Sequence, residues 1–246
     1  MPRRHKARTF PTAPLSAALL AGIFIIAAVP ARAGMGPCVP DDHEGLVCGS
    51  GDGAARVIDE TLSPSKRFAL AWRVKDGPIE EQPDDDKIEV MLIRLADGVA
   101  LTKSPSGYWN TGTMRVNRFE EHAAWSPNSR LVVRTYHTRF STDMVDVYAL
   151  APDGASAASL DLLKIMDKAV RAQLRQRVRD PDNYAFSLPL EALKVGNDGL
   201  VRSHVMMWVP KEGPERNYAL TLQVVRKPDG ALSTRVVSIV PARARR

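Results

Sequence analysis

Apolar and polar residues alternate along much of the chain, which is the period expected of half-buried β-strands. Phe68, Leu70 and Trp72 alternate with smaller or polar residues, and further predicted strands, richer in apolar residues, follow at 87–95 and 144–150. Short turn signals that contain Ser-Pro or Asp-Gly separate these segments. The pattern predicts antiparallel hairpins and a mainly β fold.

The order of turns and strands repeats. A Ser-Pro turn at Ser63 leads through two predicted strands to an Asp-Gly turn at Gly98, and Ser126 and Gly154 mark the same points of a second unit. A weaker third unit begins at an Asn-Asp-Gly turn and ends at Gly230. Serine ahead of proline can bond the turn backbone, and Asp-Gly supplies the left-handed conformation that a hairpin turn needs. We therefore expect three repeated antiparallel hairpin sheets, each with a candidate leading and trailing strand.

The second unit resembles the repeat of TolB-type exported β-propellers. The resemblance rests on the sequence AWSPNSRL at 124–131, on VYAL at 147–150 and on the Asp-Gly turn that follows. It is clearest from 124 to 154, and Asn128-Ser129 replaces the usual Asp-Gly of the family motif. Because propellers have four to eight blades and only three units are present, we expect a propeller-like or sandwich-like arrangement and not a closed full propeller.

One segment, residues 158–179, has a helical period instead. Its apolar residues fall on one face, at Leu163, Met166, Val170 and Leu174. Ser159 is a plausible N-cap, and Pro181 ends the segment. The arginines of its second half allow a membrane-surface helix as an alternative, but we expect a helix that packs on a sheet and turns its charged face to solvent. The fold prediction is thus a single β-rich domain over residues 56–241 with one inserted α-helix.

Residues 1–33 have the layout of a secretory signal peptide. A basic start precedes an uncharged, mostly apolar run at 16–29, and small residues stand at Ala31 and Ala33. We expect cleavage after Ala33 and a periplasmic or secreted protein. The alternative is an uncleaved anchor, but the apolar run is shorter than the roughly 20 residues of a membrane span. We therefore expect no stable membrane span after cleavage.

Cleavage changes the charge argument. The formal net charge of the whole chain is +6, and residues 1–33 hold five basic residues and no acidic ones, so +1 remains on the mature chain. Much of the rest of the basic excess lies in the short tail at 242–246. The charge therefore does not indicate a nucleic-acid partner.

The two cysteines, Cys38 and Cys48, lie close together near the start of the predicted mature chain. In an oxidising compartment such a pair usually forms a disulfide, and we expect this bond to stabilise an N-terminal segment at 34–55. With His43 the cysteines also have a C-x4-H-x4-C spacing that could hold zinc. Export and the missing fourth ligand favour the disulfide.

Other candidate chemistry is sparse. The acidic loop at 80–86 could bind calcium but lacks the glycine-punctuated spacing of known calcium loops, so we expect a solvated loop. Glu120 and His122 share one face of a strand and, with His137 and Asp143, could form a metal or general-base cluster. The sequence has no nucleophile elbow, phosphate loop or zinc-protease signature. We predict no cofactor, no resident metal and no catalytic residue.

Tyr108 and Trp109 lie in a loop rich in Gly, Ser and Thr. Aromatic residues on such loops often form recognition surfaces for glycans or proteins, and their alternative role is to cover a sheet edge. We therefore expect a non-enzymatic binding or interaction module of the bacterial envelope, with Tyr108 and Trp109 as binding residues and an envelope protein or glycan as partner. The alternative is a periplasmic hydrolase built from loop Asp, Glu and His residues.

Overall fold

The computed structural model describes residues 34–42, 45–75, 83–111, 114–116, 119–139, 141–174, 184–189, 193–208 and 215–242. They belong to one compact unit, Arg32–Arg246. The predicted signal peptide at 1–33 and four of the five residues of the basic tail lie outside the described residues.

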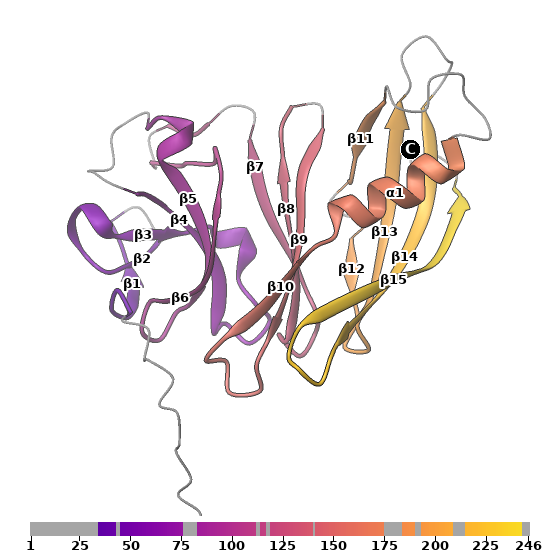
Figure 1. Ribbon diagram of the computed structural model, residues 1–246. Coiled ribbons are helices and arrows are strands. Elements are labelled where there is room, and N and C mark those ends of the chain that lie inside the picture. The colour runs from indigo at the N-terminus through magenta and orange to yellow at the C-terminus, as the bar shows by residue number, and fades with distance from the viewer. Residues whose placement is uncertain are drawn as a thin grey trace, which may run out of the picture. The chain divides into compact units, whose positions relative to one another are not determined.

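The described strands form three antiparallel sheets, none of them closed (Figure 1). The first contains β1 (Cys38–Pro40), β2 (Leu46–Cys48), β3 (Ala55–Val57), β4 (Phe68–Val74), β5 (Ile88–Arg94) and β6 (Val99–Pro105), paired in chain order. The second contains β7 (Glu120–Trp125), β8 (Leu131–His137), β9 (Thr142–Leu150) and β10 (Ala157–Asp161). The third contains β13 (Leu200–Trp208), β14 (Arg216–Arg226) and β15 (Leu232–Pro241), with β11 (Ala185–Ser187) and β12 (Lys194–Val195) both paired to β13. The predicted mainly β fold of three repeated sheets is confirmed.

Apolar side chains fill the space between neighbouring sheets. Trp72, Leu92 and Val132 belong to one cluster that joins the first and second sheets. A second cluster, which includes Val147 and Leu220, joins the second sheet to the third. Because the central strands of the second sheet contribute side chains to both clusters, this sheet is covered on both faces.

The Ser-Pro turns that begin the first two units use the predicted chemistry. Ser63 Oγ accepts the N–H of Phe68 (3.2 Å), and Ser126 Oγ accepts the N–H of Leu131 (2.9 Å). The turns of successive units are also linked, because Ser129 Oγ accepts the N–H of Ser65 (2.9 Å). Ser129 has φ +58°, a conformation that glycine adopts without strain, and its buried hydroxyl forms a bond that glycine could not form.

The single helix among the described residues, α1 (Leu163–Leu174), corrects the predicted start of the helix. Residues 158–161 instead belong to strand β10, in which Ser159 pairs with Tyr148 of β9. Ser159 is therefore not an N-cap. Pairing along β9 gives this sheet its fourth strand, which local helical spacing could not reveal. The residues from 175 to 180 lie outside the described part of the chain.

The helix packs as its pattern predicted. Met166 and Val170 are fully buried in the cluster between the second and third sheets, as is Leu162 just before the helix. Figure 1 shows α1 in front of β13 and β14.

The N-terminal segment at 34–55 is part of the first sheet and is not separate from it. Cys38 and Cys48 form the predicted disulfide and stand directly opposite each other on β1 and β2. The backbone N–H of Met35 and of Cys38 donate to the carbonyls of Gly98 and Leu95. Met35 and both cysteines belong, with Met91 and Ile93, to a third apolar cluster on the outer face of the first sheet.

Candidate functional site

A cleft of about 840 Å³ opens where the first and second sheets approach each other. We call it the inter-sheet cleft. Its walls come from the end of β3 with the short 3-10 turn η2 (Asp59–Thr61), from the segment between β6 and β7, and from β7 itself. Most lining side chains are polar or charged: Asp41, Arg56, Asp59, Glu60, Tyr108, Asn110, Arg115, Glu120, Glu121, His122, Thr138 and Arg139.

One wall carries carboxylates with no described partner. Asp41 lies 3.7 Å from Arg56 Nη1, a contact between two partly buried side chains. The carboxylates of the neighbouring Asp59 and Glu60, by contrast, form no hydrogen bond or ion pair with any residue that the structure describes. Partial burial of Asp59 and repulsion from Asp41 and Glu60 raise its pKa above the ordinary aspartate value. The wall therefore favours a bound positive charge.

The two predicted binding residues have different surroundings. Tyr108 is half-buried and lines the inter-sheet cleft, where burial, together with the negative charge of Glu60, raises its pKa. Trp109 is only 8% exposed and belongs to the apolar cluster between the first two sheets. Its side chain also borders a separate hollow beside Asp84 and Phe119. The structure thus places Tyr108 on the wall of the inter-sheet cleft and Trp109 mainly in the core.

A buried ion pair supports the cleft from behind. Arg134 on β8 donates to Glu121 on β7 through Nε (2.8 Å) and Nη2 (2.5 Å), and both side chains are almost fully buried. Ser106 Oγ donates to the same carboxylate at 2.7 Å. Burial acts to lower the pKa of Arg134, but attraction to Glu121 outweighs it and raises the pKa above the usual arginine value. No local sequence pattern indicates this pair, because only the register of β7 with β8 brings the two residues together.

The predicted histidine cluster is partly assembled. Glu120 Oε2 lies 3.3 Å from His122 Nε2, and the rings of His122 and His137 are 5.8 Å apart. His137 Nδ1 contacts the hydroxyl of Thr142 at 3.1 Å, while its buried Nε2 has no partner among the described residues. Asp143 instead accepts a hydrogen bond from Ser141. No group of three or more His, Cys, Asp or Glu side chains in the described ranges is arranged to hold a metal ion.

His137 should make stability depend on pH. Burial, with repulsion from His122, lowers its pKa from 6.5 to about 4. The folded state thus favours neutral His137. The contribution of His137 to the free energy of unfolding is therefore complete above pH 6.5 and is lost as the pH falls through 4. Allowing for its partial exposure, we expect a loss of about 1–3 kcal/mol in unfolding free energy from this group. Urea titrations between these pH values should show a flatter pH dependence for His137→Gln; equal slopes for both proteins would contradict the assignment.

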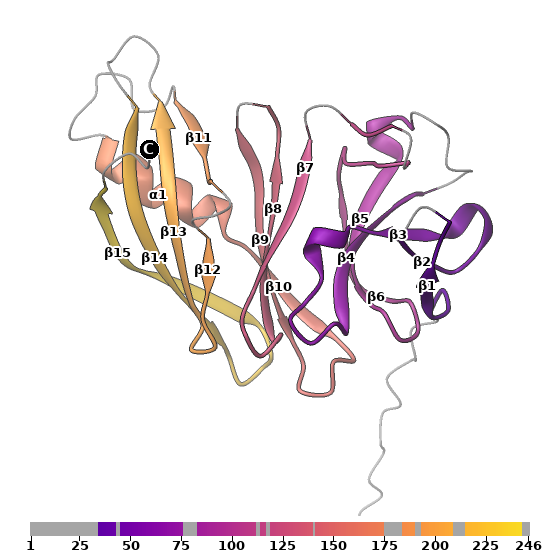
Figure 2. The same cartoon turned by 180° about the vertical axis from the view of Figure 1, so that it is seen from behind.

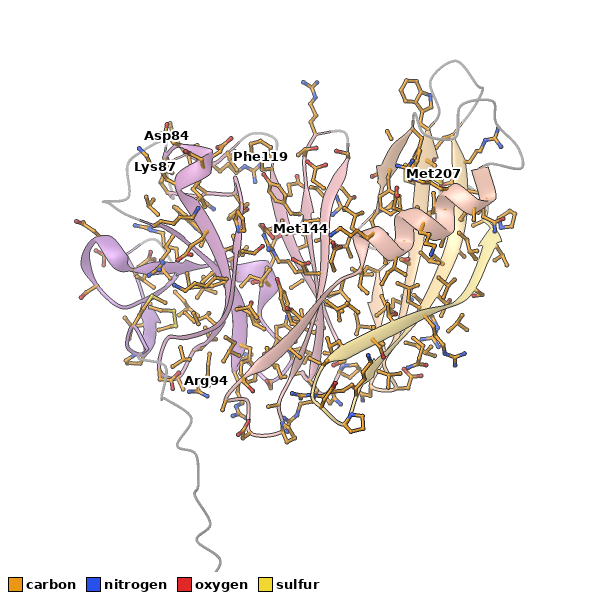
Figure 3. The ribbon with its side chains drawn as sticks, in the orientation of Figure 1. Asp84, Lys87, Arg94, Phe119, Met144 and Met207 are labelled. Atoms are coloured by element: carbon orange, nitrogen blue, oxygen red, sulfur yellow. A yellow bond between two sulfur atoms is a disulfide. The ribbon has the colours of Figure 1, made fainter. Side chains whose placement is uncertain are left out.

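The two other candidate metal sites have structural explanations where they are described. Both sulfur atoms of the cysteine pair are in the disulfide, and His43 lies outside the described residues. In the acidic loop, residues 80–82 are likewise outside the description. Asp84 forms an ion pair with Lys87 (2.8 Å), the last residue of the short 3-10 turn η3 (Asp85–Lys87). Both residues lie at one corner of the first sheet (Figure 3).

Compared with known proteins, the chain matches no family model and no curated protein sequence. Among the described residues, no helix combines the length and apolar character needed to cross a membrane. The fold and the cleft themselves are therefore the basis for a functional proposal.

Proposed function

We propose that this protein is a non-enzymatic binding module of the bacterial envelope that holds an amine-bearing glycan or peptide in the inter-sheet cleft. The observation that carries the proposal is the unpaired carboxylate pair Asp59 and Glu60 beside the half-buried Tyr108. An organic ammonium group would relieve the repulsion that raises the pKa of Asp59, and an aromatic ring can pack against the adjoining carbon atoms or the cation. The TolB-type resemblance and the predicted signal peptide support the assignment to the envelope.

A cleft of this size suits part of a chain ligand. Ligand sites commonly measure about 300–1,000 Å³, and the inter-sheet cleft measures about 840 Å³. Arg56 and Arg115 add donors on the same lining, which suit the hydroxyl, carbonyl or carboxylate groups of a sugar or peptide. The mixture of donors and acceptors favours a polar ligand with one positive group.

Titration calorimetry with glucosamine oligomers and lysine-containing peptides tests the proposal. Because each partly exposed charge contact contributes up to about 1 kcal/mol, we expect Asp59→Asn/Glu60→Gln to bind roughly tenfold more weakly. Tyr108→Ala should also weaken binding, and the exposed Asp52→Asn, outside the cleft, should bind like the wild type. N-acetylated oligomers, which lack the charge, should bind weakly.

Equal binding by the wild type and by Asp59→Asn/Glu60→Gln would contradict a cation site. The contact of Glu120 with His122 on the cleft wall favours one alternative, the periplasmic hydrolase, in which this pair would act as general base. Turnover of an oligomer during the titration, abolished in His122→Gln, would favour that hydrolase over a binding module.

A further inference from the structure

The outer face of the third sheet differs from its inner face. Along β13, Val201, Val205 and Met207 point inward and are buried in the cluster shared with the second sheet. The alternate residues point to the opposite face, which Figure 2 shows with α1 on the far side of the sheet. Side chains on this outer face are not part of the apolar cluster between the second and third sheets.

Three cations cross the outer face. Lys194 of β12 stands directly opposite Arg202 of β13, and Arg235 of β15 lies one residue pair further along the sheet, opposite Gln223. All three are exposed, and none pairs with a carboxylate among the residues that the structure describes. Like charges placed opposite each other on a sheet are destabilising. An anionic surface on this face would remove that repulsion.

An apolar cluster lies further along the same face. It comprises Ala219, which stands opposite Val240, and Met206 and Trp208 of β13, with the hydrogen-bonded pair His204 and Asn217 (2.8 Å) between them. Trp208 is 51% exposed and Val240 52%, whereas the apolar residues on the inner face of the same sheet, such as Val205 and Leu220, are buried. The face therefore combines positive charge and exposed apolar area within one stretch of sheet.

We propose that the outer face of the third sheet docks on an anionic lipid bilayer. A bilayer presents phosphate groups beside acyl chains, which match the two halves of this face, and tryptophan is favoured where headgroups and acyl chains meet. A second copy of the chain would place the same three cations against each other. A nucleic acid would pair with the cations but leave the apolar cluster uncovered. This membrane-docking face shares no residue with the inter-sheet cleft, so the two proposals can be tested separately.

The binding is peripheral, and its strength is electrostatic in large part. Each Lys or Arg near an anionic leaflet strengthens binding by a factor of about five. Three cations together should strengthen membrane binding by a factor of about 100. Salt near 1 M would screen this attraction.

Co-sedimentation of the predicted mature chain, residues 34–246, with vesicles tests the proposal. We expect binding to an equal mixture of phosphatidylethanolamine and phosphatidylglycerol at about 0.1 M salt, and loss of binding near 1 M salt. Vesicles of phosphatidylcholine alone should not bind. Lys194→Gln/Arg202→Gln/Arg235→Gln should lower the partition coefficient about 100-fold, and Trp208→Ala should lower it several-fold.

The exposed Lys168 of α1 provides the matched control, because the helix lies on the other side of the sheet. Lys168→Gln should bind vesicles like the wild type, and circular dichroism should show all variants folded. Equal binding by the triple variant and by Lys168→Gln would overturn the proposal. Failure of the wild type to bind anionic vesicles would also overturn it.

Discussion

Replacing Arg134 by methionine is expected to lower the free energy of unfolding by about 3–5 kcal/mol, because it leaves the buried carboxylate of Glu121 without its partner. Glu121 and Arg134 are joined by two hydrogen bonds, and both side chains are almost fully buried. Arg134 Nη1 also lies 3.7 Å from Asp146, whose pKa is raised by burial despite the attraction of Arg134. Urea unfolding followed by tryptophan fluorescence measures the effect.

Two further variants separate charge from packing. Glu121→Leu/Arg134→Met removes both members of the pair and should recover most of the lost stability, since apolar residues of similar volume often replace a buried pair without loss. Arg171→Met breaks the more exposed pair with Asp167 on α1 and should cost less than about 1 kcal/mol. A double variant as unstable as Arg134→Met would show that the ion pair is not the cause.

Replacing Trp109 by alanine is expected to destabilise the protein by about 3–5 kcal/mol, as is typical of a large aromatic side chain removed from a core. Trp109 is 8% exposed and packs in the cluster that joins the first and second sheets. If the variant still folds, its affinity for a ligand of the cleft should change little compared with that of Tyr108→Ala.

Thermal unfolding and calorimetry on the same samples distinguish the two aromatic residues. Trp109→Phe keeps most of the buried ring and should recover at least half of the stability lost in Trp109→Ala. A Trp109→Ala variant with wild-type stability and a lost ligand would show that Trp109, and not Tyr108, contacts the ligand.

Local sequence patterns were sufficient for the architecture within each unit. Alternation predicts hairpins because successive side chains of a strand point to opposite faces, and the Ser-Pro and Asp-Gly turns act over a few residues. The hydroxyls of Ser63 and Ser126 bond the turn backbone, and Gly98 and Gly154 have the expected positive φ. The disulfide was predictable for the same reason, since its cysteines are ten residues apart. The relation to TolB-type propellers stays a prediction.

Local patterns were insufficient where two interpretations share the same residues. Residues 158–161 fit the apolar spacing of the following helix, yet pairing with β9 makes them a strand. Tyr108 and Trp109 are adjacent and chemically alike, but one lines the cleft and the other lies in the core. The pairing with β9 decides the first case, and packing against a neighbouring sheet decides the second. Neither depends on residues close in sequence to the position concerned.

The mainly β class, the three hairpin units, the turn chemistry and the disulfide could be predicted because each depends on residues close together in the chain. The residues that form the cleft could not, because they come from separate strands and sheets. Asp59 and Glu60 meet Tyr108, and Glu121 meets Arg134, through contacts between strands and sheets. The cationic outer face of the third sheet could not be predicted from the sequence either, because the register of β12 with β13 and of β14 with β15 aligns its three cations. Register and sheet packing depend on the sum of many distant contacts, which no single stretch of sequence specifies.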